Sequence, residues 1–349
     1  MTIIFFTRRF YPDVGGVEKH VFEISKRLKN KGYKVIIITE SKSNSENVHN
    51  YQYVSESAKL MGKSDQIQVH TLKVTSNMRF KKYQIWLELW KMRNVIKSAD
   101  IVHCHDVFFW YLPFRILYPR KKVFTTFHGY ESYPISKKAI LIRKLSAVLS
   151  FGNICIGDYI QKWYKTNPTY VSYGAVSRTN HQEESGKASA LFFGRLDDQT
   201  GIMTYLKAYK KIKKIIPSFS LKVVGDGTLK YKLPIGVKHI GFDPEISKYI
   251  QKYKIIFVSR YLSILEGLEA KRMVFAVYDN PIKKDYLEMA PFKDFIHISG
   301  SSDDLSTKVV QYLSRPNSMS NKITQGYKWA IKQTWENLVD TYLALWNYK

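Results

Sequence analysis

Short apolar runs rich in β-branched residues alternate with longer amphipathic segments along most of this chain. In the first pair, residues 3–6 are typical of a buried strand, and residues 17–31 carry apolar side chains at helical spacing. Strand, helix and strand in succession predict βαβ units, which build a parallel sheet covered on both faces. The alternation therefore predicts an α/β fold.

The pattern occurs twice, once on each side of a polar stretch at residues 179–189 that is typical of a linker. Before it we expect strands at 3–6, 34–39, 67–74, 99–106 and 123–127, helices at 17–31, 79–97 and 135–150, and a loop at 41–49. After it we expect strands at 190–193, 220–224, 238–240, 254–258 and 274–277, and helices at 202–216, 262–272, 305–313 and 323–346. A length of 349 residues also favours two domains. We predict them at residues 1–180 and 187–349.

A glycine pair, Gly15 and Gly16, lies in the stretch Phe-Tyr-Pro-Asp-Val-Gly-Gly-Val-Glu-Lys-His at residues 10–20. It leaves the backbone without side chains just before a predicted helix. Amides at a helix N-terminus can bind an anion or let a ligand approach closely. An ordinary strand-to-helix turn is the alternative.

Histidines occur at the ends of two predicted strands. His103 and His105 are two residues apart, so their imidazoles lie on one face of the strand, and His128 follows the next strand. Ligands of parallel sheets bind at the carboxyl ends of the strands, where His105, His128 and Gly16 are all expected. A metal site at His103 and His105 is conceivable, but the sequence offers no evident third ligand.

The chain carries 55 Lys and Arg against 29 Asp and Glu, a net charge of +26. Such an excess favours a polyanionic partner, nucleic acid or an anionic membrane, unless it reflects a general lysine bias. Residues 135–150 combine basic and apolar side chains, as expected of a helix on an anionic membrane or of one packed on a core. We find no nucleic-acid recognition motif. Without a long apolar run, a signal peptide or a disulfide framework, we expect a cytoplasmic, peripherally membrane-associated protein.

Six segments, taken in order, resemble the motifs of glycosyltransferase family 4. Residues 10–20 resemble F-x-P-x-x-G-G-V-E-x-H, residues 100–105 resemble D-[IV]-V-H-x-H, and residues 125–129 resemble T-x-H-G. Residues 193–196 resemble F-x-G-R-L, residues 224–227 V-G-D-G, and residues 265–276 L-E-A-x-A-x-x-x-P-V-x-A. The resemblance implies a GT-B fold: two Rossmann-like parallel-sheet domains facing each other across a cleft, with a C-terminal helix that returns to the first domain.

The same resemblance implies an activity. It is the retaining transfer of a sugar from a nucleotide-sugar donor to a glycan or lipid-linked acceptor, without a cofactor and usually without a metal. The domain at 1–180 would hold the acceptor, and the domain at 187–349 the donor.

The resemblance also implies roles for individual residues. Arg195 matches the arginine that contacts the diphosphate, Glu266 the glutamate that binds the ribose hydroxyls, and His128 the histidine that faces the donor sugar. Alternatively, Glu266 is a surface helix position and His128 an ordinary residue at a strand end. Further donor contacts are implied for Gly15, Gly16, Gly225, Leu262 and Ser263, and acceptor-side positions for His20 and His105.

The sequence departs from the family pattern at two charged positions. Thr200-Gly201 stands where the family usually has Lys-Gly, so one phosphate-binding cation is missing. Val258 stands where the first glutamate of an E-x7-E pair with Glu266 would fall, and the loop at 259–263 is shortened. Arg260 or a nearby lysine could replace the missing cation. Two functions therefore remain open: an active transferase and a catalytically silent GT-B protein that serves as a binding or regulatory subunit.

Overall fold

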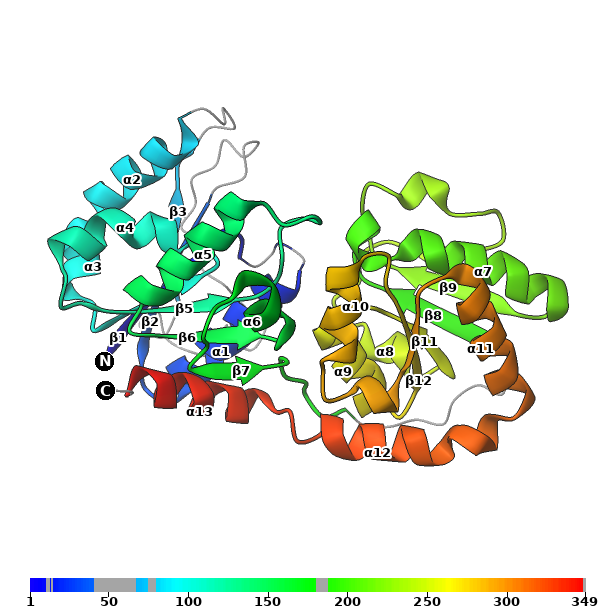
Figure 1. The fold of residues 1–349 in the computed structure, drawn as a ribbon. Helices are drawn as coiled ribbons and strands as arrows, with labels where there is room; N and C mark the ends of the chain where they lie inside the picture. The colour runs from blue at the N-terminus through cyan, green and yellow to red at the C-terminus, as the bar shows by residue number, and fades with distance from the viewer. Residues whose placement is uncertain (11–12, 14, 41–66, 75–79, 180–187, 348–349) are drawn as a thin grey trace. The chain divides into compact units, whose positions relative to one another are not determined.

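The computed structural model describes residues 1–10, 13, 15–40, 67–74, 80–179 and 188–347 (Figure 1). The chain divides into two compact units. The first unit comprises Met1–Ile156, Ile160–Ser172 and Glu336–Lys349; the second comprises Gly157–Tyr159 and Tyr173–Trp335. Each unit contains one parallel sheet, so the predicted pair of α/β domains is confirmed. The predicted boundary at residues 180–187 lies outside the described residues.

The first unit is built on a seven-stranded sheet in the order β3-β2-β1-β4-β5-β6-β7. Its strands are β1 (Thr2–Thr7), β2 (Lys34–Glu40), β3 (Gln68–Leu72), β4 (Ile101–His105), β5 (Lys122–Phe127), β6 (Gly152–Ile156) and β7 (Tyr170–Ser172). All neighbouring strands are parallel. The strand order reverses between β1 and β4, and ligands bind at the carboxyl ends of the strands at such a point.

Helices cover both faces of this sheet. They are α1 (Gly16–Asn30), α2 (Lys81–Lys91), α3 (Arg93–Ser98), α4 (Phe108–Leu117), α5 (Lys137–Leu149), α6 (Tyr159–Tyr164) and α13 (Trp335–Trp346). Alternate residues of a strand point to opposite faces, so Phe6 of β1 packs with Leu89 of α2 and Phe114 of α4 in one core. Phe5 points to the opposite face and contacts Tyr342 of α13.

The C-terminal helix α13 returns to the first unit, as expected (Figure 1). Arg27 of α1 donates to Glu336 at 2.8 Å, and Lys31 lies 3.5 Å from Asp340. The apolar side of α13 is buried against the sheet, with Trp346 2% exposed. This burial, rather than the surface ion pairs, provides most of the stabilisation, because exposed ion pairs contribute at most about 1 kcal/mol each.

The second unit repeats the topology in a six-stranded parallel sheet, β10-β9-β8-β11-β12-β13. Its strands are β8 (Ser189–Phe193), β9 (Ser220–Val224), β10 (Lys238–Ile240), β11 (Ile255–Phe257), β12 (Met273–Val277) and β13 (His297–Ser299). Its helices are α7 (Ile202–Ile215), α8 (Ser247–Ile250), α9 (Tyr261–Glu269), α10 (Pro281–Glu288), α11 (Ser302–Ser314) and α12 (Ser320–Ala330). The order again reverses between the first and fourth strands of the unit.

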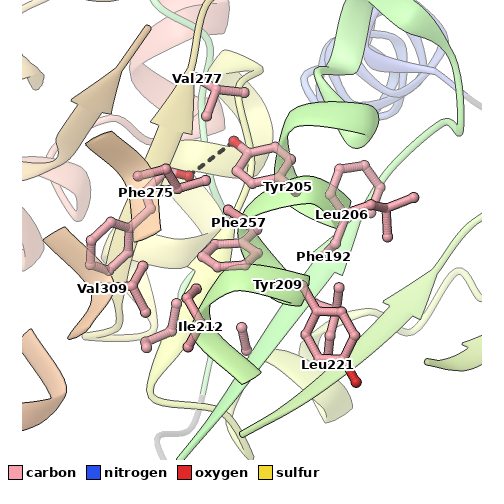
Figure 2. Packing of buried hydrophobic residues seen from close by; sticks show 14 of the residues in the cluster. Phe192, Tyr205, Leu206, Tyr209, Ile212, Leu221, Phe257, Phe275, Val277 and Val309 are labelled. Atoms are coloured by element: carbon pink, nitrogen blue, oxygen red, sulfur yellow. Dashed lines mark hydrogen bonds between the residues drawn. The ribbon is translucent and has the colours of Figure 1, made fainter. Parts of the chain in front are cut away.

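One core of the second unit lies between the sheet and helices α7 and α11 (Figure 2). Tyr205 of α7 stacks on Phe257 of β11, with 4.9 Å between the ring centroids. Its hydroxyl donates to the carbonyl of Phe275 at 3.0 Å, drawn as a dashed line in Figure 2. A buried hydroxyl without a partner would destabilise the fold, so this bond lets a tyrosine occupy the core.

Several predicted boundaries are wrong. The single helix expected at 79–97 is two helices, α2 and α3, which meet at Met92. The helix expected at 323–346 ends at Ala330, and α13 begins only at Trp335, because Val176 pairs with Thr334 between them. Strands β6, β7 and β13 were not predicted. The loop at 41–49 lies outside the described residues, and no described helix is long and apolar enough to cross a membrane.

Two glycine turns of the second unit pack backbone against backbone. Gly225 follows β9 with φ +141°, and a Cβ atom there would lie 1.9 Å from the carbonyl oxygen of Gly194, which follows β8. Gly227 approaches the backbone of Leu196 in the same way. A side chain at either position would force the two turns apart.

We therefore predict that Gly225→Ala destabilises the second unit by about 3–5 kcal/mol, through backbone strain plus the clash. Gly236→Ala is the matched control, because Gly236 also has positive φ (+90°) but no atom within 4 Å of the added Cβ. Its cost should be only about 1–2 kcal/mol. Urea unfolding followed by circular dichroism measures both, and equal costs would contradict the close approach of the turns.

Candidate active site

Three histidines of the first unit converge at the carboxyl ends of its central strands. His105 ends β4, His128 follows β5, and His20 lies in α1, which follows β1; β4 pairs with both β1 and β5. Nδ1 of His105 lies 2.8 Å from Nε2 of His128, a hydrogen-bond distance. The ring centroids of His20 and His128 are 4.7 Å apart at an interplanar angle of 87°. The sequence spaces these residues over more than a hundred positions, and the sheet brings them together.

The backbone of His128 is fixed by an ion pair between buried Arg143 and Asp106, whose side chain is 33% exposed. Its amide donates to both carboxylate oxygens of Asp106, at 3.1 and 3.2 Å. Arg143, 5% exposed, lies 3.7 Å from Asp106 and donates to the carbonyl of Gly129 at 2.6 Å and to Glu131 at 2.9 Å. Burial raises the pKa of Asp106 to about 6, although Arg143 and the amide of His128 both act to lower it. Arg143 thus anchors the turn that carries His128.

The imidazoles are held in their neutral form. Burial lowers the pKa of His20, His103 and His105 well below the usual value, and neighbouring imidazoles lower it further. Burial likewise lowers the pKa of His128 to about 3. A neutral imidazole can both donate and accept a hydrogen bond, which a protonated one cannot. The cluster is therefore suited to binding uncharged hydroxyl groups.

The same three histidines could geometrically hold a metal ion, since one ring nitrogen from each lies within 4.8 Å of the others. The predicted pair His103 and His105 is not this set. Nδ1 of His105 and Nε2 of His128, however, are already joined by the 2.8 Å hydrogen bond, which a metal would have to replace. The absence of a metal remains a prediction.

The glycine pair lies at the start of α1. Gly15 is the N-cap residue and makes no side-chain cap, and Gly16 is the first helical residue. The first amides of an α-helix have no partner within the helix and point outward, which suits an anion. A Cβ at Gly15 would collide only with the flexible side chain of Glu18.

In the second unit, charged side chains gather where β8 and β11 end side by side. Arg195 follows Gly194 and lies 3.3 Å from Asp197. Arg260, after β11, donates to the side chain of Gln199 at 2.7 Å. Lys283 is buried and donates to the carbonyl of Ser259; burial and Arg260 lower its pKa. The carboxylates of Asp197 and Asp279 also act on Lys283, so this end of the sheet carries cations and anions together.

The remaining predicted donor residues lie on α9 and the turn after β9. Leu262 and Ser263 form the first turn of α9, and Glu266 lies one turn further, half-buried. Gly225 is buried against Gly194, so its turn adjoins the backbone that leads to Arg195.

The two positions that depart from the family pattern, Thr200 and Val258, are both buried. Thr200 is buried, and its amide and hydroxyl both donate to Asp197, at 3.1 and 2.7 Å. Val258 is 1% exposed, so an acidic side chain in its place would be a buried charge. Neither position offers a charged group to a ligand.

Comparison with known proteins identifies the family. The profile described as Glycosyltransferase Family 4 matches residues 14–167, and that of Glycosyl transferases group 1 matches residues 176–329. This chain belongs to the family 4, group 1 glycosyltransferases. These are retaining enzymes of GT-B fold that use nucleotide-sugar donors, so the resemblance inferred from the motifs is confirmed.

Individual relatives are distant. An uncharacterized glycosyltransferase of Methanocaldococcus jannaschii is 22% identical over 95% of this chain and 93% of its own length. The gpi3 subunit of phosphatidylinositol N-acetylglucosaminyltransferase from Schizosaccharomyces pombe is 24% identical over 62% of this chain and 49% of its own length. The structure of Anabaena HepE in complex with UDP and glucose shares the fold, with a TM-score of 0.72, 12% identity and coverage of 99% and 98%.

Sequence reasoning missed the residues that support the site. The pattern of residues 135–150 fits a helix on a membrane or one packed on a core, and the structure buries Arg143 of this segment beneath the His128 turn. Tyr342 and Lys283 were not singled out, because nothing local marks a buried tyrosine or lysine. No local signal marks Arg143 either, because Lys137, Lys138 and Lys144 lie in the same helix.

The buried imidazoles predict a pH dependence of stability. In the unfolded chain each histidine takes up a proton near pH 6.5, whereas in the folded chain these four do not, so stability falls as pH drops below about 6.5. Each contributes up to about 1.4 kcal/mol per pH unit. Asp106 acts in the opposite direction between about pH 6 and pH 4, because the folded chain binds its proton more tightly.

The variant His103→Gln isolates one of these contributions. Its destabilisation relative to the parent should shrink by up to about 1.4 kcal/mol for each pH unit below 6.5. The same comparison at pH 8, where imidazole is neutral in both states, gives the cost unrelated to protonation. A difference in unfolding free energy that stays constant from pH 8 to pH 5 would contradict the neutral, buried assignment.

Proposed function

We propose that this chain is an active retaining glycosyltransferase that moves a sugar from a nucleotide-sugar donor to a glycan or lipid-linked acceptor at a membrane surface. The second unit binds the donor, and the first unit binds the acceptor and the membrane. The observation that carries the membrane assignment is the outward-facing apolar side of α5. The two arginines that follow β8 and β11, Arg195 and Arg260, support donor binding.

Departure of a nucleoside diphosphate requires positive charge at the phosphates, because negative charge develops there in the transition state. Arg195 supplies a guanidinium that can bind phosphate in a bidentate manner. Arg260 supplies the second one. Its guanidinium donates to the side chain of Gln199, the residue before Thr200, where the family lysine is missing. Lys283 is a poorer candidate, because it is 2% exposed and bonded to Ser259.

The nucleoside is assigned to α9. Glu266 accepts hydrogen bonds from the two ribose hydroxyls, since a carboxylate can take both at once. Leu262 and Ser263 lie one turn before it and contact the donor from the start of the helix. Because Gly225 has no side chain, its backbone packs directly against that of Gly194, and the donor can approach both backbones.

The first unit supplies neutral hydrogen-bonding groups and an anion site. His128 faces the transferred sugar, and His20 and His105 lie on the acceptor side of it. Their uncharged imidazoles suit sugar hydroxyls, which both donate and accept. The amides at Gly15 and Gly16 suit a negatively charged group.

Helix α5 buries polar side chains and exposes apolar ones, which is the reverse of an ordinary surface helix. Its buried residues are Arg143 and Ser146, whereas Leu141, Leu145 and Val148 are 58%, 51% and 79% exposed. These three side chains are spaced four and three residues apart, so they lie on one side of the helix. An apolar side facing outward, flanked by exposed Lys137, Lys138 and Lys144, fits the interface of an anionic membrane.

Two neighbouring helices, α2 and α4, also expose apolar side chains next to basic ones. Helix α4 packs against both α2 and α5, and the three helices lie next to one another in Figure 1. Both α2 and α4 expose large apolar side chains, namely Tyr83, Leu87, Trp90, Leu112, Ile116 and Leu117. Lys82 and Arg93 lie over the rings of Tyr83 and Trp90. Apolar groups interleaved with cations favour a lipid surface over water.

A lipid-linked acceptor follows from this location, because an enzyme held at the interface meets acceptors confined to it. The gpi3 relative is named for a transferase acting on phosphatidylinositol, a membrane lipid, which supports the same class of acceptor. A catalytically silent binding subunit is the second candidate. It is favoured by Thr200 and Val258, where the family carries charged residues.

For the donor site we predict that Arg195→Ala and Arg260→Ala each lower donor affinity or turnover at least tenfold. A charge-assisted hydrogen bond contributes about 1.5–3 kcal/mol, which corresponds to this factor or more. Arg315→Ala, at an exposed arginine that caps α11 of the same unit, is the control and should leave both unchanged. Thermal shifts with UDP-, GDP- and ADP-sugars measure binding, and released nucleotide measures turnover.

Two outcomes of this experiment would contradict parts of the proposal. Unchanged binding in Arg195→Ala contradicts the diphosphate assignment. Donor binding that depends on Arg195 but never leads to nucleotide release, with or without membrane acceptors, supports the silent subunit.

For the membrane surface we predict that the full chain floats with vesicles containing anionic lipid at low salt and detaches as salt rises. The triple variant Leu141→Gln, Leu145→Gln, Val148→Gln should weaken binding about a hundredfold, because partial burial of each side chain contributes roughly 1 kcal/mol. Reversal of Lys137, Lys138 and Lys144 to Glu should remove the dependence on anionic lipid. Arg143 is left unchanged, since it is buried.

The second unit provides a matched control for this test. Tyr231, Ile235 and Phe242 are also large, apolar and exposed. Their joint replacement by Gln removes the same number of exposed apolar groups and should leave flotation unaltered. Equal loss in both triple variants, or no flotation of the parent at low salt, would contradict the assignment to α5.

A further inference from the structure

A continuous chain of hydrogen bonds runs through the buried face of the first unit, from the C-terminal helix to His20. Nε1 of Trp346 donates to Nδ1 of His103 at 3.0 Å, and Nε2 of His103 lies 2.7 Å from the hydroxyl of Thr126. That hydroxyl lies 2.9 Å from the hydroxyl of Tyr342, which lies 2.8 Å from Nε2 of His20. All five side chains are buried.

The first link fixes the direction of the chain. An indole N–H can only donate, so Nδ1 of His103 must be an unprotonated acceptor. The single proton of a neutral imidazole then lies on Nε2, and His103 donates to the hydroxyl of Thr126. The tautomer of His103 therefore follows from the identity of Trp346 alone.

The hydroxyls of Thr126 and Tyr342 continue the same order of donor and acceptor toward His20. Having accepted from His103, the Thr126 hydroxyl donates to Tyr342, and the Tyr342 hydroxyl donates to Nε2 of His20. In this arrangement each hydroxyl accepts once and donates once within the chain. If Tyr342 donated to Thr126 instead, the proton of Thr126 would need an acceptor elsewhere.

We propose that α13 fixes the tautomer of His20, with its proton on Nδ1, through a one-way hydrogen-bond chain that begins at Trp346. Tyr342 and Trp346 are then positioning residues for the histidine cluster. The ring of His20 lies across that of His128 at 4.7 Å, so the fixed dipole of His20 acts directly on His128. Its importance for turnover rests on the function proposed above, whereas the tautomer itself can be measured without a substrate.

The test uses nitrogen NMR of the full chain labelled with ¹⁵N in the histidine rings, which distinguishes protonated from unprotonated ring nitrogens. His20→Gln and His103→Gln identify the two signals among the nine histidines. In the parent, we expect His103 to be protonated only at Nε2 and His20 only at Nδ1. A His20 protonated at Nε2 in the parent would overturn the proposal.

Two variants distinguish a one-way chain from simple packing. Tyr342→Phe removes the donor to His20, so His20 should become a mixture of tautomers while His103 stays unchanged. Trp346→Phe removes the indole N–H, so the hydrogen bonds can then run in either direction. Both histidines should become mixtures of tautomers, although Trp346 bonds only to His103. A His20 signal unmoved by Trp346→Phe would overturn the chain.

The matched control is Tyr205→Phe in the second unit, which also removes a buried, hydrogen-bonded tyrosine hydroxyl. It should leave both histidine signals unchanged. In the active enzyme, Trp346→Phe should lower kcat several-fold with little change in the KM for the donor. Shifted tautomers with an unchanged kcat would leave the chain in place and overturn its role in positioning.

Discussion

The first unit depends on one constraint, which is that polar groups buried on a sheet must find partners. His103 and His105 point to the same face of β4, and that face is covered by α1 and α13 rather than by water. An apolar covering helix would leave Nδ1 of His103 without a partner, at a cost of about 1–3 kcal/mol. Trp346 donates to that nitrogen, and the Tyr342 hydroxyl bonds Thr126 and His20, so α13 contributes hydrogen bonds as well as apolar packing. Nε2 of His105 is buried without a hydrogen-bond partner among the described residues.

The second unit has the same kind of strand order but different residues at the carboxyl ends of its strands. Its carboxyl ends carry glycines and cations instead of buried histidines, with Gly194 and Gly225 in backbone contact and Arg195 beside them. Repetition of one topology with different end residues gives one unit a cluster of neutral imidazoles and the other a cluster of arginine, lysine and aspartate side chains. The topology determines where the sites lie, and the residues at the strand ends determine their chemistry.

Much of the fold was predictable because strand and helix periodicity is a local property. The period of two in β4 placed His103 and His105 on one face, and their ring centroids are 5.1 Å apart. The orientation of α5 was not predictable, because it depends on Arg143 pairing with Asp106 and Glu131, which no local pattern reveals. Tyr342 lies 322 positions from its partner His20, so its role emerges only when the chain is folded.

The return of α13 also bears on the order in which the chain can fold during synthesis. Residues 336–346 complete the core of the first unit, yet the ribosome makes them after the whole second unit. Domains of multidomain chains generally fold in order of synthesis, N-terminal first. Here the second unit can close as soon as it emerges, whereas the first must wait with its histidine-bearing face uncovered. The first unit to be translated is therefore the last to finish folding, and chaperones have their longest opportunity to bind at that uncovered face.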